Sequence, residues 1–213
     1  MAQVIELSFP ALGGEIPLDH GYALYGALSR VLPELHGEGF DAAVAPVHGQ
    51  AAGDGRLRLD GRSRLRLRLP AERIAAVLPL AGKALELDGC RLRLGVPQVS
   101  ALEPAASLQA WTVTIKNAVE PEAFLAAVRA DLAEMGVRGE PGLPPVEAGP
   151  HAGKPRRRAV RIKDNLIVGF AVIVQGLSAD ESILLQERGL GGRRKMGCGW
   201  FAPLRPRHAE EHP

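Results

Sequence analysis

The chain has 213 residues, of which 46% are hydrophobic, and its 26 cationic and 24 acidic side chains leave a formal net charge of +2. These values are typical of a soluble globular protein with one large or two small domains. No apolar run approaches the ~20 residues that span a bilayer, and the first residues show no cationic-then-apolar signal pattern. The two cysteines, Cys90 and Cys198, lack the spacing of a disulfide framework or a zinc site. We therefore expect a cytoplasmic protein with no membrane contact, no metal and no cofactor.

The first half of the chain is predicted to alternate between strands and helices. Two Asp-Gly pairs mark turns within alternating segments, which is typical of hairpins. The predicted elements are a strand over 4–9, a helix from an Asp19 N-cap to about Leu32, a strand over 40–47, paired strands within 55–69 turned at Asp60 and Gly61, a short helix over 71–80, and paired strands within 83–94 turned at Asp88 and Gly89.

The second half repeats this order after a junction at about residues 103–107. Its predicted elements are a strand over 107–116, a helix from Pro121 to Met135, a proline-rich loop over 139–155, strands over 156–163 and 165–175, a helix capped by Ser178, and a closing strand over 200–204. Each half thus follows a βαββαβ plan. The predicted fold class is α+β, with tandem ferredoxin-like (RRM-like) domains at 1–104 and 105–213.

Arginine alternates with leucine in three segments of the first half, 56–59, 64–69 and 91–94. Strand geometry places alternate side chains on opposite faces, so the leucines should face a core and the arginines should form a cationic face. The charges repel each other unless an anion is present, which favours binding of a polyanion. We expect Arg58, Arg66 and Arg68 to make such contacts. The alternative is that these arginines only keep an edge strand soluble.

The second half carries its own cationic strand and a glycine-rich loop. Glycine allows close backbone approach and positive φ, so that backbone N–H groups can converge on an anion. The loop lacks the spacing of a P-loop or a dinucleotide fingerprint, and the alternative is an ordinary mobile turn with solvated charges. The residues expected to bind the polyanion are Arg156, Arg157, Arg158, Arg161, Gly189, Gly191, Gly192, Arg193, Arg194, Lys195, Gly197 and Gly199.

The candidates for chemistry are grouped around the first helix. They are His20, Tyr22, Tyr25 and His36, with His48 in reserve and with His208 and His212 in a polar tail. Histidine titrates near neutral pH and can act as general base or general acid. RNA carries its own nucleophile, a 2′-hydroxyl that can attack the adjacent phosphorus, so such a reaction needs no metal. The alternative for each residue is a structural place in the core or on the surface.

Two segments resemble the Cas six family, the CRISPR-associated endoribonucleases that process repeat RNA, and within it the small branch of myxobacterial-type systems. Residues 189–199 match a Gly-hydrophobic-Gly motif repeated after five residues, and residues 35–40 match Leu-His-x-x-Gly-aromatic. The resemblance implies tandem ferredoxin-like domains and a catalytic role for His36, with His20 as the rival. Some members place a catalytic lysine soon after the histidine. This chain has no lysine before Lys83, so Arg56 or Tyr25 would have to replace it.

Two functions follow from the resemblance. The first is a metal-independent endoribonuclease that cleaves CRISPR repeat RNA, leaves a 2′,3′-cyclic phosphate and a 5′-hydroxyl, and retains the mature crRNA. The second is a non-catalytic RNA-binding subunit of a CRISPR effector complex, with other subunits as partners. A small-molecule anion-binding protein is disfavoured, because cations spread over so many strands exceed what one ligand needs.

Overall fold

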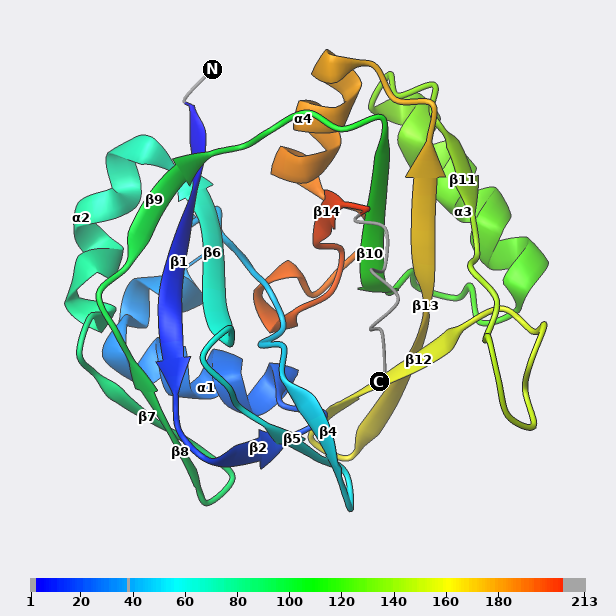
Figure 1. Cartoon of the computed structure of the whole chain (residues 1–213). Helices are drawn as coiled ribbons and strands as arrows, with labels where there is room; N and C mark the ends of the chain where they lie inside the picture. The colour runs from blue at the N-terminus through cyan, green and yellow to red at the C-terminus, as the bar shows by residue number, and fades with distance from the viewer. Residues whose placement is uncertain (1–2, 38, 205–213) are drawn as a thin grey trace, which may run out of the picture.

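The computed structural model describes residues 3–37 and 39–204 and shows a mixed α/β fold with curled antiparallel sheets. The sheets of the two halves stand side by side, and α4 and β14 lie between their centres (Figure 1). All helices and strands of the sequence-based prediction have a counterpart, although several boundaries and one strand pairing differ.

The sheet of the first half is built around β1, Val4–Leu12, which pairs with β6 on one side and with β9 on the other. Along its main path the strand order is β3-β6-β1-β8-β7. The other elements of this half are α1 Gly21–Val31, β3 Ala43–Val44, β6 Arg64–Pro70, α2 Ile74–Val77, β7 Ala84–Leu87, β8 Cys90–Leu94 and β9 Gln98–Ala101. Short 3-10 turns flank α2 and also follow α1 as η1, Pro33–His36. Strand β9 was not predicted.

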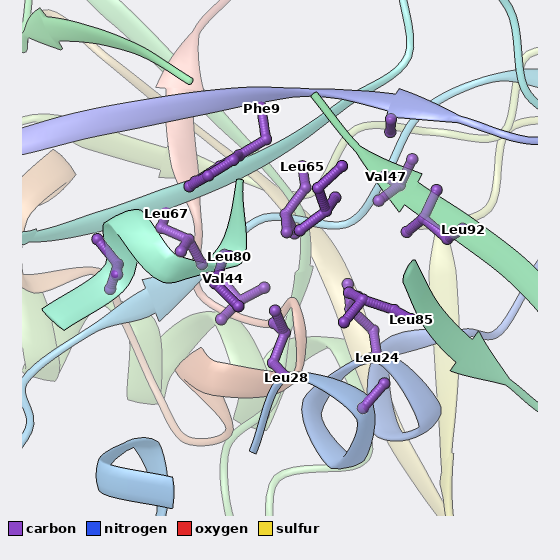
Figure 2. Packing of buried hydrophobic residues seen from close by; sticks show 14 of the residues in the cluster. Phe9, Leu24, Leu28, Val44, Val47, Leu65, Leu67, Leu80, Leu85 and Leu92 are labelled. Carbon is purple, nitrogen blue, oxygen red and sulfur yellow. The ribbon is translucent and has the colours of Figure 1, made fainter. Parts of the chain in front are cut away.

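The core of this half lies between the sheet and its helices. Leucines of β6 and Phe9 of β1 point toward Leu24 and Leu28 of α1 (Figure 2). Phe9, Leu28 and Leu65 are fully buried, and burial of each such side chain contributes about 1.5–3 kcal/mol. The leucine face predicted from the alternating sequence is therefore confirmed for β6.

The predicted hairpin within residues 55–69 is wrong. Strand β5, Arg56–Arg58, instead joins a separate three-stranded sheet between β2, Glu15–Pro17, and β4, Gln50–Gly53. Asp60 does close a turn, because its carbonyl accepts from the Ser63 N–H, but this turn connects two different sheets. Alternation identifies which face of a strand is apolar and does not identify its partner.

The second half is built around β10, Ser107–Val113, and β13, Asn165–Gln175, in the strand order β11-β13-β10-β14. Its other elements are α3 Pro121–Glu134, β11 Glu140–Gly142, β12 Arg157–Ile162, α4 Ala179–Arg188, the 3-10 turn η4 Arg194–Met196, and β14 Phe201–Pro203. Ser178 caps the start of α4, as predicted, and the structure adds a capping box with Glu181. The segment 139–155 is not wholly a loop, since it contains β11.

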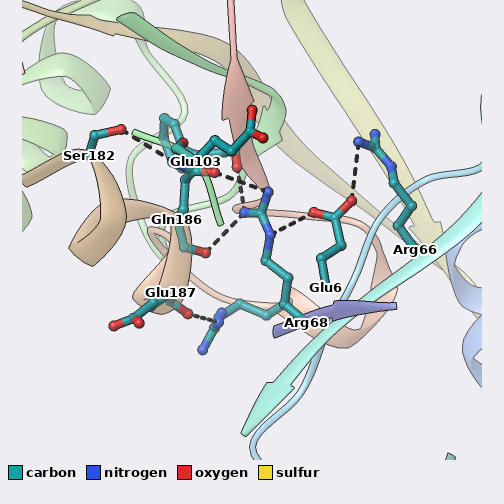
Figure 3. Close-up of polar contacts among 9 residues, drawn as sticks. Glu6, Arg66, Arg68, Glu103, Ser182, Gln186 and Glu187 are labelled. Atoms are coloured by element: carbon teal, nitrogen blue, oxygen red, sulfur yellow. Dashed lines mark hydrogen bonds and ion pairs between the residues drawn. The ribbon is translucent and has the colours of Figure 1, made fainter. Parts of the chain in front are cut away.

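The buried Arg68 joins the two halves. Its guanidinium donates to the backbone carbonyls of Gln186 and Phe201, forms an ion pair with Glu6 at 3.1 Å, and lies 4.0 Å from the ring centroid of Trp200 (Figure 3). Only 3% of Arg68 is exposed. The expectation that Arg68 contacts a polyanion is therefore corrected, because its donors are used inside the protein.

Candidate active site between helix α1 and the glycine loop

Tyr25 and His36 form a hydrogen-bonded pair at the end of the first helix. Tyr25 lies on α1 and His36 on the η1 turn that follows it, and the hydroxyl of Tyr25 lies 2.9 Å from Nδ1 of His36. The two rings meet edge to face, with centroids 5.0 Å apart. His36 is exposed, whereas Tyr25 is half-buried and also packs against the core. The pair therefore combines a fixed tyrosine with an imidazole open to solvent.

The glycine loop, defined here as residues 189–199, folds tightly on itself. A Cβ atom at Gly199 would collide with the carbonyl of Leu190, and Gly199 has φ of +66°. The backbone N–H of Gly199 donates to the carbonyl of Thr112 in β10, and that of Gly192 donates to the carbonyl of Thr114, just after β10. These two N–H groups are therefore not available to an anion. The expectation that the backbone of Gly192 and Gly199 binds the polyanion is wrong. The glycines serve close packing of the loop.

Two cations of the glycine loop reach the first half of the chain. Lys195 donates to the carbonyls of Leu35 at 2.7 Å and Gly37 at 3.2 Å, the residues on either side of His36. Arg194 forms an ion pair with Asp41 at 3.3 Å. The loop thus contacts the histidine segment directly, although the two are far apart in the sequence.

A hollow of about 350 Å³ lies beside this contact. It is lined on one side by Tyr25 and on the other by the glycine loop, with Gly191, Arg193 and Lys195 among its walls. Arg193 also donates to the hydroxyl of Thr114 at 3.3 Å. The hollow therefore places cationic side chains next to the tyrosine of the Tyr25–His36 pair.

A second and larger cleft, of about 630 Å³, opens between the two halves. Trp111 lines this cleft and is 42% exposed. The ring centroids of Trp111 and His48 lie 5.6 Å apart, and the guanidinium of Arg158 lies 5.3 Å from the ring centroid of Trp111. Arg157 also lines this cleft and is exposed. A β-bulge between Ala110 and Val113 interrupts the alternation of side chains along β10 at this point.

His20 has a structural place, contrary to its candidacy for catalysis. It is 3% exposed; its Nδ1 lies 2.9 Å from the Pro17 carbonyl, and its Nε2 accepts a hydrogen bond from the Val47 N–H. Burial lowers the pKa of His20, which favours the neutral ring that these bonds require. Neither nitrogen is left for a substrate. Tyr22 lies one turn before Tyr25 and is half-buried, but it is Tyr25 that meets His36.

Most of the other expected cations lie apart from one another. Arg58 is exposed on the three-stranded sheet and pairs with Glu15, so it does not share a strand face with Arg66. Arg66 pairs with Glu6 at 3.8 Å. Arg56, the suggested substitute for a lysine, donates to Sγ of Cys90, and nothing places it near His36.

The cations of β12 and its start differ in exposure. Arg156 pairs with Glu147 and is largely covered, whereas Arg157 and Arg161 are exposed. Asp19, predicted as an N-cap, instead accepts a hydrogen bond from the backbone N–H of Arg161 at 2.7 Å, and His20 stands at the N-cap of α1. This bond anchors β12 beside the start of α1.

Within residues 3–37 and 39–204, no three His, Cys, Asp or Glu side chains are grouped so that they could hold a metal ion. None of the helices in the same part of the chain is long and apolar enough to cross a membrane.

Comparison with known proteins gives matches for nearly the whole chain. The family model described as "Cas6 Crispr" matches residues 5–206. A curated protein of Myxococcus xanthus (strain DK1622), the "CRISPR-associated endonuclease Cas6", is 46% identical over 199 residues, which cover 93% of this chain and 81% of that protein.

Two solved structures share the fold at low sequence identity. One, described as "CRISPR associated protein Cas6", is 14% identical with a TM-score of 0.63 and covers 96% of this chain and 100% of its own. The other, "An RAMP protein binding different RNA substrates", is 10% identical with a TM-score of 0.62 and covers 95% and 99%.

Proposed function

Because the chain belongs to the Cas6 family of CRISPR-associated proteins, we propose that it is a cytoplasmic endoribonuclease that cleaves CRISPR repeat RNA without a metal ion. The observation that carries the proposal is the hydrogen bond between Tyr25 and His36 beside a cationic hollow. The endonuclease named among the relatives supports catalysis over the alternative of a non-catalytic RNA-binding subunit.

His36 serves as the proton-transfer residue in this proposal. A base removes the proton of the 2′-hydroxyl, the 2′-oxygen forms a bond to phosphorus, and the bond from phosphorus to the 5′-oxygen breaks as an acid protonates that oxygen. The products are a 2′,3′-cyclic phosphate and a 5′-hydroxyl. His36 is exposed, and an imidazole is the side chain that most often serves as either the base or the acid in such a reaction.

Tyr25 suits both protonation states of that histidine. A phenolic hydroxyl can donate or accept a hydrogen bond. It can donate to a bare Nδ1 of His36, and it can accept from Nδ1 when that nitrogen carries a proton. With the proton on Nδ1 and the Tyr25 oxygen accepting it, the 2.9 Å contact persists while Nε2 gains or loses a proton. Tyr25 fixes the ring and leaves the other nitrogen to the RNA.

The glycine loop supplies the charge. The phosphorane formed by 2′-oxygen attack carries extra negative charge, which preorganised cations stabilise. Arg193 lines the hollow beside Tyr25 and is the side chain of the loop that we assign to the phosphate. Further phosphates of the RNA would follow the exposed Arg157 and Arg161 of β12, and an unpaired base would stack on Trp111 in the larger cleft.

The same family membership supports a finer reading of the architecture. We propose two ferredoxin-like domains at 1–104 and 105–213. In the first half β1 lies between β6 and β9, and in the second half β10 lies between β13 and β14; two helices accompany each sheet. We also propose that the cleaved crRNA stays bound and that other effector subunits join the complex.

The test is cleavage of a transcribed CRISPR repeat from the same genome by the full chain in EDTA. Wild type should produce a 2′,3′-cyclic phosphate end. His36→Ala should slow cleavage about 10²- to 10⁴-fold, the usual scale for loss of a general acid or base, and should bind RNA with little change. Tyr25→Phe should slow cleavage less. Binding without cleavage by wild type would establish the non-catalytic subunit instead, and cleavage only with added Mg²⁺ would refute the metal-independent mechanism.

A further inference from the structure

Lys195 binds the backbone on both sides of His36. Its ammonium group donates to the carbonyl of Leu35 at 2.7 Å and to the carbonyl of Gly37 at 3.2 Å. An ammonium has three N–H donors, so two of the three are used within the protein. This arrangement differs from that of Arg193, whose guanidinium donates to the Thr114 hydroxyl within its own half.

The histidine turn is held by few backbone hydrogen bonds, while the neighbouring Leu35 side chain packs into the core. His36 ends a single 3-10 turn, Pro33–His36, and that kind of turn has weaker hydrogen-bond geometry than an α-helix. The turn itself contributes the Gly37 N–H bond to the Glu34 carbonyl. Tyr25 holds the imidazole from one side, and Lys195 holds the backbone that carries it.

The backbone of the glycine loop is held in place on both sides of Lys195. Gly21, the first residue of α1, lies so close to the Met196 carbonyl that a Cβ atom there would collide with it. Arg194 pairs with Asp41 on the other side of Lys195. The lysine therefore extends from a fixed backbone to the histidine turn.

We propose that Lys195 is a positioning residue that acts through His36, and that the glycine loop sets the catalytic histidine as well as contacting RNA. This inference rests on the proposed role of His36. It assigns the three neighbouring cations different roles: Lys195 orients the histidine turn, Arg194 joins the loop to Asp41, and Arg193 faces the hollow.

The test compares Lys195→Met and Lys195→Arg with wild type and with the matched control Lys83→Met, a change at an exposed lysine before β7. Single-turnover cleavage of the repeat transcript gives the rate at saturating protein and the half-saturating concentration. NMR of the RNA-free protein gives the NOE between the rings of Tyr25 and His36, whose centroids lie 5.0 Å apart. The NOE requires no activity.

For Lys195→Met we expect a saturating rate about 10- to 100-fold lower, since small misplacements of a catalytic group have effects of that size. We expect little change in half-saturation and a weaker ring NOE. Lys195→Arg, which keeps two donors for the carbonyls, should restore most of the rate and the NOE. Lys83→Met should match wild type in all three.

Three outcomes would overturn the inference. One is an unchanged rate and NOE in Lys195→Met, and another is a raised half-saturating concentration with an unchanged saturating rate, which would make Lys195 an RNA contact. If Lys195→Met does not fold, Lys195→Gln takes its place, and a wild-type NOE in that variant is the third. Failure of wild type to cleave would instead refute the proposed function, and the NOE series would still decide the position of the histidine.

Discussion

His20 and His36 stand at opposite ends of helix α1 and in opposite environments. His36 is exposed beside Tyr25, whereas both ring nitrogens of His20 are bound within the protein. A proton added at Nε2 of His20 would break the hydrogen bond from the Val47 N–H and would bury a charge. The same residue type is therefore open to solvent at one position and a structural group at the other.

This contrast predicts a pH-dependent stability. The pKa of His20 is lowered in the folded state by burial, so the unfolded chain binds the proton more tightly. The contribution of His20 should be complete above about pH 6.5, the ordinary histidine pKa, and should be lost as the pH falls below that value toward the lowered folded-state pKa.

Thermal unfolding of the RNA-free protein between about pH 5 and 8 measures this effect. His20→Gln, which cannot be protonated, should show a flatter decline toward acid than wild type. His151→Gln, at an exposed histidine, is the matched control and should follow the wild-type profile. Parallel profiles for wild type and His20→Gln would refute the structural role assigned to the buried ring.

At the scale of elements, the glycine loop depends on the absence of side chains. Gly199 combines a positive φ with close contact to the Leu190 carbonyl. Gly199→Ala should lower the free energy of unfolding by about 2 kcal/mol or more, because a left-handed non-glycine residue costs about 1–2 kcal/mol before any collision is counted. Gly192→Ala is the control in the same loop, since a Cβ atom there meets nothing within 4 Å. Equal urea midpoints for the two variants would contradict this account.

Elements with local signals were predictable from the sequence. Asp88 and Gly89 both adopt positive φ in the β7–β8 turn, as an Asp-Gly hairpin requires. Pro121 and Ser178 mark the starts of α3 and α4 within one residue. In each case the decisive interaction lies within a few residues of the signal.

Pairings between distant segments were not predictable in the same way. The alternation of arginine and leucine is identical in β5 and β6, yet β5 pairs with β2 and β4 while β6 pairs with β1 and β3. The candidate site shows the same limit. His36, Tyr25 and the cations of the glycine loop were identified from residue type and motif, but the contact of Lys195 with the histidine turn arises only from tertiary packing.

At the scale of the whole molecule, Arg68 fixes the glycine loop to the first half. It holds the carbonyls of Gln186 and Phe201, which lie just before and just after the loop (Figure 3). Burial lowers the pKa of Arg68 to about 10 despite the opposing effect of Glu6, so the group stays charged at neutral pH. The buried Arg68 thus binds the segments on both sides of the glycine loop and connects them to the first half.

Arg68→Met should lower the free energy of unfolding by about 3–5 kcal/mol, because removal of one partner leaves Glu6 and two carbonyls without their main donor. Arg66→Met is the matched control on the same strand and with the same acid at 3.8 Å; its more exposed pair should contribute under about 1 kcal/mol. Urea unfolding followed by tryptophan fluorescence measures both. A loss for Arg68→Met no larger than that for Arg66→Met would show that the joint lies elsewhere.

The contact between Lys195 and the His36 turn has a consequence for the order of protein synthesis. The ribosome synthesises Tyr25 and His36 before the glycine loop, which follows helix α4 and contains the lysine that contacts the His36 turn. A growing chain therefore carries its histidine without the orienting lysine until the glycine loop has been synthesised. We expect cleavage activity only after β14 pairs with β10 and the loop packs against α1.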